Sequence, residues 1–141
     1  MSGFLIDTNV ISEFAKAKPE SRVIQWLDNT DSALLFVSVV TLGELRLGIC
    51  ELPEGKRRRQ LEDWLSQGLP SWFESNLLPV SKAFADGWGR MAAEAKQQGI
   101  HLTTTDGQIA ATAKAHDLTL VTRNIKDFSG LGVELLNPWE A

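Results

Sequence analysis

Short, continuously apolar runs alternate with amphipathic stretches along the whole of this chain. The apolar runs, which predict strands, lie at 3–6, 34–39, 77–80, 118–122 and 133–136. The stretches with helical spacing lie at 9–16, 20–29, 40–51, 55–68, 82–98 and 106–116. Strands without a polar face are buried on both sides, and strand–helix alternation is typical of parallel sheets. The pattern therefore predicts an α/β fold, a three-layer α/β/α sandwich with a central, mainly parallel sheet.

The composition is that of an ordinary globular protein, with 141 residues of which 43% are hydrophobic and 23% charged. This length predicts a single domain spanning residues 1–141. No apolar run approaches the ~20 residues that span a bilayer, and the N-terminus lacks the features of a signal peptide, so no membrane association is expected. Cys50 is the single cysteine; no internal disulfide can form, and a cytoplasmic location is expected.

Polar and acidic residues gather where the predicted strands end. Asp7 follows the first strand, Glu44 lies in the helix after the second, and Asp106 begins a helix. Asn124 and Asp127 follow the fourth predicted strand. In open parallel sheets, ligands bind outside the carboxyl ends of the strands. These chain-distant segments are therefore expected to meet at one edge of the sheet.

Each acid also has a purely structural explanation when it is considered alone. Asp7 can be the N-cap of the helix that follows it. Asp106 can interact with a helix dipole in the first turn of a helix that Thr105 caps. Glu44 lies in an apolar helix, and Arg46 or a nearby lysine can be its ion-pair partner.

Taken together, the structural explanations are weaker, because independent caps have no reason to converge on one edge of one sheet. Oxygen ligands without cysteine or histidine suit Mg²⁺, with Mn²⁺ as the alternative. Such ions activate water and stabilise displacement at phosphate. The sequence contains no Gly-rich phosphate loop, and no Ser or Cys nucleophile with a positioned His is evident. Metal-dependent chemistry at a phosphate is therefore the favoured interpretation.

Charge alone does not decide whether the chain contacts nucleic acid. The net charge is −4, whereas nucleic-acid-binding proteins usually carry a basic face. A bound divalent ion would neutralise part of this charge. One run, "KRRR", is a candidate nucleic-acid contact, although such runs are commonly solvated helix faces. It consists of Lys56, Arg57, Arg58 and Arg59.

Four segments of the sequence resemble a known family. They are "LIDTNVISE", "SVVTLGELRLGI", "TTTDGQIAATAKAHDLTLVTRNIKDF" and the terminal "LLNPWEA". Together they resemble the PIN-domain family, in its bacterial VapC-like toxin branch and especially the FitB-like members. The resemblance implies a Mg²⁺-dependent endoribonuclease that cleaves RNA phosphodiester bonds with a metal-activated water. It also implies a homodimer paired with a cognate antitoxin, which contacts DNA only through that antitoxin.

The family's acidic positions fall on specific residues of this chain. Its first three acids fall on Asp7, Glu44 and Asp106, which the resemblance implies as the metal ligands. In FitB-like members the fourth acid directly follows "TR", a position that Asn124 occupies here. Many VapC-like members instead place an Asp three residues later, where Asp127 stands. Both residues are candidates for the fourth position.

Two further residues are candidate hydrogen-bond donors to the metal ligands, namely Thr8 and Ser38. Two other function classes also stay open. One is a catalytically weak PIN-domain subunit of an antitoxin–DNA complex that regulates its own transcription. The other is a phosphatase of the aspartyl-phosphate type. That chemistry calls for a second Asp two residues after Asp7, where this chain has Asn9.

Overall fold

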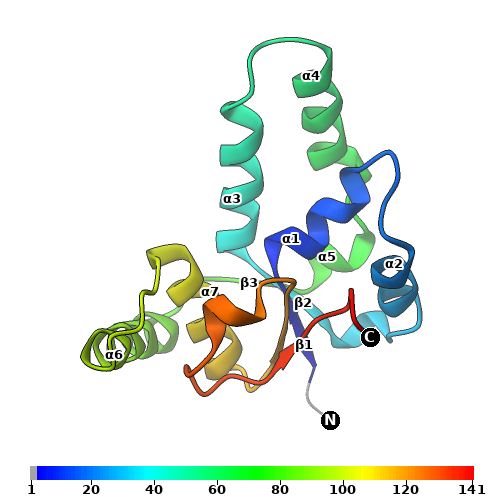
Figure 1. The fold of residues 1–141 in the computed structure, drawn as a ribbon. Helices are drawn as coiled ribbons and strands as arrows, with labels where there is room; N and C mark the ends of the chain where they lie inside the picture. Colours follow the sequence, from blue (N-terminus) through cyan, green and yellow to red (C-terminus); the bar gives the residue numbers. More distant parts are fainter. Residues whose placement is uncertain (1–2) are drawn as a thin grey trace.

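A computed structural model describes residues 3–141, so Met1 and Ser2 of the predicted domain lie outside the described part. At its centre, five parallel strands pair in the order β3-β2-β1-β4-β5 (Figure 1). The strands are β1 (Phe4–Ile6), β2 (Leu35–Ser38), β3 (Leu77–Leu78), β4 (Thr119–Val121) and β5 (Leu135–Leu136). All five predicted strands and the parallel sheet are confirmed.

The strand order reverses direction between β1 and β4. From β1 the chain proceeds outward to β2 and β3, then returns to the other side of β1 for β4 and β5. In the register of this pair Ile6 lies opposite Val121, and the Asp7 N–H donates to the Val121 carbonyl at 3.0 Å. Such a reversal opens a crevice at the carboxyl ends of the two strands. Asp7 and Thr122, which follow those strands, therefore lie at its mouth.

Helices connect the strands. They are α1 (Thr8–Ile11), α2 (Ser21–Asp28), α3 (Val39–Cys50), α4 (Lys56–Asp63), α5 (Ser71–Ser75), α6 (Lys82–Gln97) and α7 (Thr104–Ala115). Short 3-10 or π turns are η1 (Ser12–Ala15), η2 (Ser32–Leu34), η3 (Trp64–Gly68) and η4 (Ile125–Phe128). The helix predicted over 9–16 is thus α1 followed by η1, and that over 55–68 is α4 followed by η3. The prediction missed α5.

Two apolar clusters lie on the two faces of the sheet. In β1, Ile6 belongs to the cluster that packs under α1, α2, α3 and α5, whereas Leu5 belongs to the cluster under α6 and α7. The same alternation holds in β4 for Val121 and Leu120. Successive strand residues point to opposite faces. The predicted three-layer arrangement is therefore confirmed, with α6 and α7 on one side of the sheet and α2 and α5 on the other (Figure 1).

Helices α3 and α4 form a hairpin that extends away from the sheet (Figure 1). The turn between the two helices, at residues 51–55, lies at its tip. Arg58 stabilises it by donating to the Leu52 carbonyl at 3.2 Å and pairing with Glu62 at 3.2 Å. No helix within residues 3–141 has the length and apolar character needed to cross a membrane.

Candidate functional site

Asp7 both caps a helix and points a second oxygen toward the crevice between β1 and β4. Its Oδ1 accepts from the Thr8 N–H at 2.8 Å, which makes it the N-cap of α1. Its Oδ2 accepts from the Thr122 hydroxyl at 2.8 Å and from the Asn9 amide at 3.4 Å. The side chain is only 6% exposed. The structural explanation from sequence was therefore correct, yet it accounts for one oxygen only.

The ionised form of Asp7 is disfavoured in this position. Burial raises the pKa of its carboxyl from 3.8 to about 6, against the hydrogen bonds from Thr122 and Thr8. The negative charges of Glu44 and Asp106 raise it further. These three carboxylates thus lie within electrostatic range of one another, although they come from widely separated parts of the chain.

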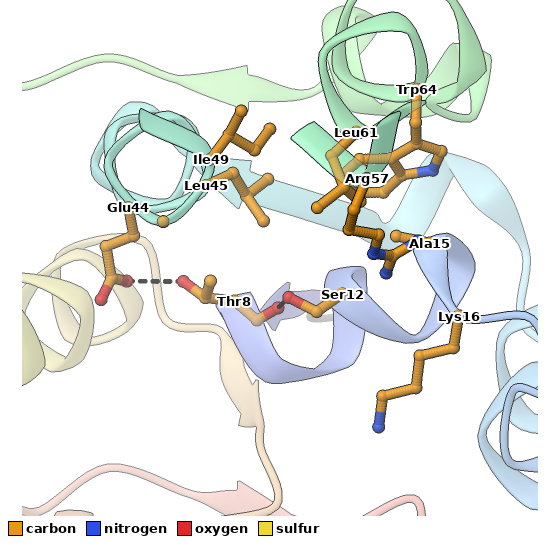
Figure 2. A pocket seen from close by; sticks show the side chains of 11 residues that line it. Thr8, Ser12, Ala15, Lys16, Glu44, Leu45, Ile49, Arg57, Leu61 and Trp64 are labelled. Carbon is orange, nitrogen blue, oxygen red and sulfur yellow. Dashed lines mark hydrogen bonds between the residues drawn. The ribbon is translucent and has the colours of Figure 1, made fainter. Parts of the chain in front are cut away.

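Glu44 projects from the second turn of α3 toward α1. Its Oε1 accepts from the Thr8 hydroxyl at 2.5 Å, as Figure 2 shows. Thr8 also lies 3.5 Å from the Thr41 hydroxyl, which is fully buried. The alternative partner Arg46 is exposed and forms no ion pair with Glu44 within the described chain. Thr8 therefore connects the first and second acids of the predicted set.

Asp106 lies in the first turn of α7, but Thr103 rather than Thr105 caps this helix. The Thr103 hydroxyl accepts from the Asp106 N–H at 3.2 Å. Burial raises the pKa of the Asp106 carboxyl, against a hydrogen bond with Thr103, and the charge of Asp127 raises it further. The helix begins two residues earlier than predicted because any of three consecutive threonines can serve as a cap.

The two candidates for the fourth position occupy the loop after β4. The Asn124 N–H donates to the Thr122 hydroxyl at 3.1 Å, so the backbone of Asn124 is tied to the residue that binds Asp7. Asp127 lies in η4 and is the neighbour whose charge acts on Asp106. Both line a cavity of about 470 Å³ together with Arg123 and Lys126.

Ser38 and the basic run have other contacts. The Ser38 hydroxyl accepts from the Val40 N–H at 3.1 Å and caps α3; within the described residues it has no hydrogen bond to the acids. In the basic run, Arg58 stabilises the α3–α4 turn, whereas Arg57 lines a cavity that also includes Glu44.

No side-chain cation of residues 3–141 forms an ion pair with the predicted acids. Between residues 3 and 141, the ion pairs are Lys16–Glu13, Arg58–Glu62 and Arg90–Asp86. As placed, no three Asp, Glu, His or Cys side chains of this range lie close enough to hold a metal ion. The donor chemistry nevertheless fits a hard divalent cation, because the four acids offer oxygen ligands and none of them forms an ion pair within the described residues. They are Asp7, Glu44, Asp106 and Asp127.

Sequence reasoning missed three residues that hold these acids in place. Thr122 is fully buried and bonds to Asp7, Asn9 and Asn124. Asn9 additionally accepts from the Arg123 N–H at 3.2 Å, and Thr41 lies behind Thr8. The signal for Thr122 was its place at the end of a strand, which becomes informative only once β4 is known to pair with β1.

Comparisons with known proteins point in one direction. A family model described as "PIN domain" matches residues 4–132. Toxin FitB of Neisseria gonorrhoeae is 38% identical over 135 residues, covering 96% of this chain and 97% of that protein. VapC ribonuclease Y4jK of Sinorhizobium fredii is 36% identical over 136 residues, again covering 96% and 97%. The solved structure of FitAB bound to an IR36 DNA fragment has a TM-score of 0.87 at 36% identity, covering 96% of this chain and 95% of that one.

Proposed function

The chain belongs to the PIN-domain family, and we propose that it is a Mg²⁺-dependent endoribonuclease that acts as the toxin of a toxin–antitoxin pair. Two relatives that align along nearly its whole length are named as a toxin and as a VapC ribonuclease. The solved structure described as FitAB is a complex with a DNA fragment. These relatives support RNA as the substrate class and a protein partner for this chain.

The observation that carries the proposal is a group of carboxylates at the switch point of the sheet, none of which forms an ion pair within residues 3–141. Asp7 is the N-cap of α1, Glu44 lies in α3 and Asp106 in α7, and the charges of the other two raise the pKa of Asp7. Folding such groups together is unfavourable unless something positive binds there. A site of this kind fits a divalent ion together with the phosphate groups of a nucleic acid.

In this proposal Asp7, Asp106 and Glu44 hold Mg²⁺, or Mn²⁺ in its place. When bound, the ion would supply a Lewis acid that activates water and neutralises charge on the phosphodiester. The protein would supply orientation. Thr122 and Thr8 fix the two oxygens of Asp7, and the Thr8 hydroxyl simultaneously fixes Glu44.

For the fourth position we favour Asp127 over Asn124. The negative charge of Asp127 raises the pKa of Asp106, which lies in the first turn of α7, and this supports Asp127 as the fourth group. The backbone of Asn124 bonds to Thr122, which indicates a role in shaping the loop. Asp127 would therefore orient water or complete the ligand set.

The proposal includes a cognate antitoxin, a homodimeric arrangement and a cytoplasmic location. With a net charge of −4, this chain is poorly suited to bind DNA directly, so DNA contact would pass through the antitoxin. An arginine of that partner would suit the acidic site, since its guanidinium pairs with carboxylates in bidentate fashion.

A second role is favoured by one comparison. Because the relative described as FitAB is bound to a DNA fragment, a complex of this chain with its antitoxin is a candidate for transcriptional autoregulation. A catalytically weak subunit would suffice for that role. The retained acids favour the nuclease, and the two roles are compatible in one protein.

The test is RNA cleavage by the purified protein with Mg²⁺, with EDTA, and with the Asp7→Asn variant. Cleavage should require the metal and disappear in Asp7→Asn, whereas the exposed Asp63→Asn control should cleave normally. The antitoxin gene of such a pair is expected next to the toxin gene, so co-expression with a small neighbouring gene, followed by size exclusion and a gel shift, tests the partner. Full activity of a folded Asp7→Asn protein would contradict the assignment of this site.

A further inference from the structure

A cavity of about 270 Å³ lies beside the acidic site, between α1–η1 on one side and the α3–α4 hairpin on the other. Its walls are largely apolar and include Leu45, Ile49 and Leu61 (Figure 2). Thr8 and Glu44 also line it, so the cavity is continuous with the proposed catalytic edge. A ligand at that edge would extend into this space.

The two ends of the cavity carry opposite charge. In Figure 2, Glu44 lies at one end, whereas Arg57 and Lys16 lie toward the other. The Lys16 ammonium pairs with the buried Glu13 carboxylate at 2.5 Å, which fixes its position and still leaves donors for a further anion. Arg57 forms no ion pair within residues 3–141. The cationic end is therefore able to bind an anionic group.

An aromatic side chain also lines the cavity. Trp64 packs against the apolar core and contributes to the cavity wall. Its Nε1 is buried, so a ligand in the cavity would meet the apolar ring and not the N–H group. Nucleobases combine flat apolar faces with acceptor atoms at their edges, and they stack on aromatic side chains in single-stranded RNA complexes.

We propose that this cavity binds one unpaired nucleotide of the RNA substrate, next to the phosphodiester that is cut. Its base lies against Leu61 and Trp64, and its phosphate binds Lys16 and Arg57. The inference rests on the proposed nuclease function. A nucleotide fits because one unit combines an anion with an apolar face, and because the same strand would place its next phosphate at the proposed metal site, which Glu44 helps to form.

The inference also divides the basic run of α4. Arg57 lines the cavity, whereas Arg58 is engaged with Glu62 and the α3–α4 turn. Arg59 is exposed and does not line the cavity. A general electrostatic role would make these residues equivalent, whereas a nucleotide site makes Arg57 distinct. Arg59 is thus the matched control.

The first experiment measures binding rather than cleavage. A fluorescein-labelled single-stranded RNA that the wild-type protein cleaves is titrated with Asp7→Asn protein by anisotropy, in Mg²⁺ buffer over a range of salt concentrations. In the Asp7→Asn protein, a second substitution is then introduced. Arg57→Ala and Lys16→Ala should each reduce the slope of log Kd against log salt by about 0.7, the value for one lost phosphate contact on a single strand. Adding Arg59→Ala should leave the slope unchanged.

The second experiment changes the RNA, so it does not depend on a variant that folds. Each nucleotide beside the cleavage site is made abasic in turn. At one position, binding should weaken by about fivefold or more, without a change in salt slope. In Leu61→Ala protein that abasic change should weaken binding less.

Three outcomes would overturn the inference. Equal slopes of log Kd against log salt for Arg57→Ala and Arg59→Ala would contradict the phosphate contact at Arg57. Equal RNA binding at every abasic position would contradict a bound base. If Arg57→Ala and Lys16→Ala bind RNA like the wild type but no longer bind the co-expressed partner protein, the cavity binds a segment of that protein and not a nucleotide. A wild-type protein that neither binds nor cleaves RNA would instead refute the proposed function, and the nucleotide site with it.

Discussion

Replacing Asp7 by asparagine should remove activity and at the same time stabilise the metal-free protein. The pKa of this buried carboxyl is about 6 in the folded chain, against 3.8 for an ordinary aspartate. The folded state therefore favours the protonated form. The stability that protonated Asp7 gives the folded state is complete below pH 3.8 and is lost as the pH rises through about 6. At pH 7 the ionised Asp7 therefore opposes folding.

The size of the effect follows from the same values. A change from 3.8 to about 6 corresponds to about 3 kcal/mol of folding free energy at neutral pH. Asparagine keeps one oxygen for the Thr8 N–H, but its amide replaces the oxygen that accepts from Thr122 and Asn9. That loss costs about 1 kcal/mol. We therefore expect a net gain of about 1–2 kcal/mol, which corresponds to a rise in Tm of about 5 °C.

The assay is thermal and urea unfolding of both proteins in EDTA between pH 4 and pH 8. The stability of Asp7→Asn relative to wild type should increase between pH 4 and pH 7, and Asp63→Asn should match wild type. Mg²⁺ or Mn²⁺ should then raise the Tm of the wild type but not of Asp7→Asn, because only a ligand that binds the folded state stabilises it. A folded Asp7→Asn protein that is no more stable than wild type at pH 7 would refute this reasoning.

Three other variants probe the surroundings of the site. By calorimetry, Asp127→Ala should weaken Mn²⁺ binding more than Asn124→Ala does; the reverse order would make Asn124 the fourth group. Thr8→Val removes the hydroxyl that holds the α3 glutamate, so Mn²⁺ affinity should fall about tenfold with a change in unfolding free energy below ~1 kcal/mol; unchanged affinity would contradict that role. Gly107→Ala would place a Cβ 2.9 Å from the indole nitrogen of the α6 tryptophan, so urea unfolding should show a loss of about 1 kcal/mol, whereas Gly89→Ala on open helix surface should show none; equal stabilities would exclude the predicted steric clash.

The strands and the edge that they form were predictable because their signals are local. Each strand is a continuous apolar run, and a parallel sheet follows from the alternation with helices. The position of Asp7 directly after such a run was enough to place it at the edge. Helix limits were less predictable. Thr103, Thr104 and Thr105 can each cap a helix, and in the structure Thr103 is the N-cap.

The missed features depend on long-range geometry. Thr122 bonds to Asp7 across 115 positions of sequence, and nothing local to "LVTRN" specifies that contact. Similarly, α5 is a five-residue helix between Pro70 and β3, too short to show helical periodicity. Asp7 and Thr122 become neighbours only through the pairing of β1 with β4, which an apolar run alone cannot define.

The structural and functional explanations of these acids are complementary. Asp7 caps α1, and Asp106 lies in the first turn of α7, so each carboxylate lies beside a helix N-terminus, where the first N–H groups have no carbonyl partner within the helix. This partial positive charge lets the chain fold with its acids together before any cation binds. Glu44, in the second turn of α3, lacks that support and relies on the Thr8 hydroxyl instead. Capping is therefore the means by which the fold tolerates a site whose full charge balance comes from outside the chain.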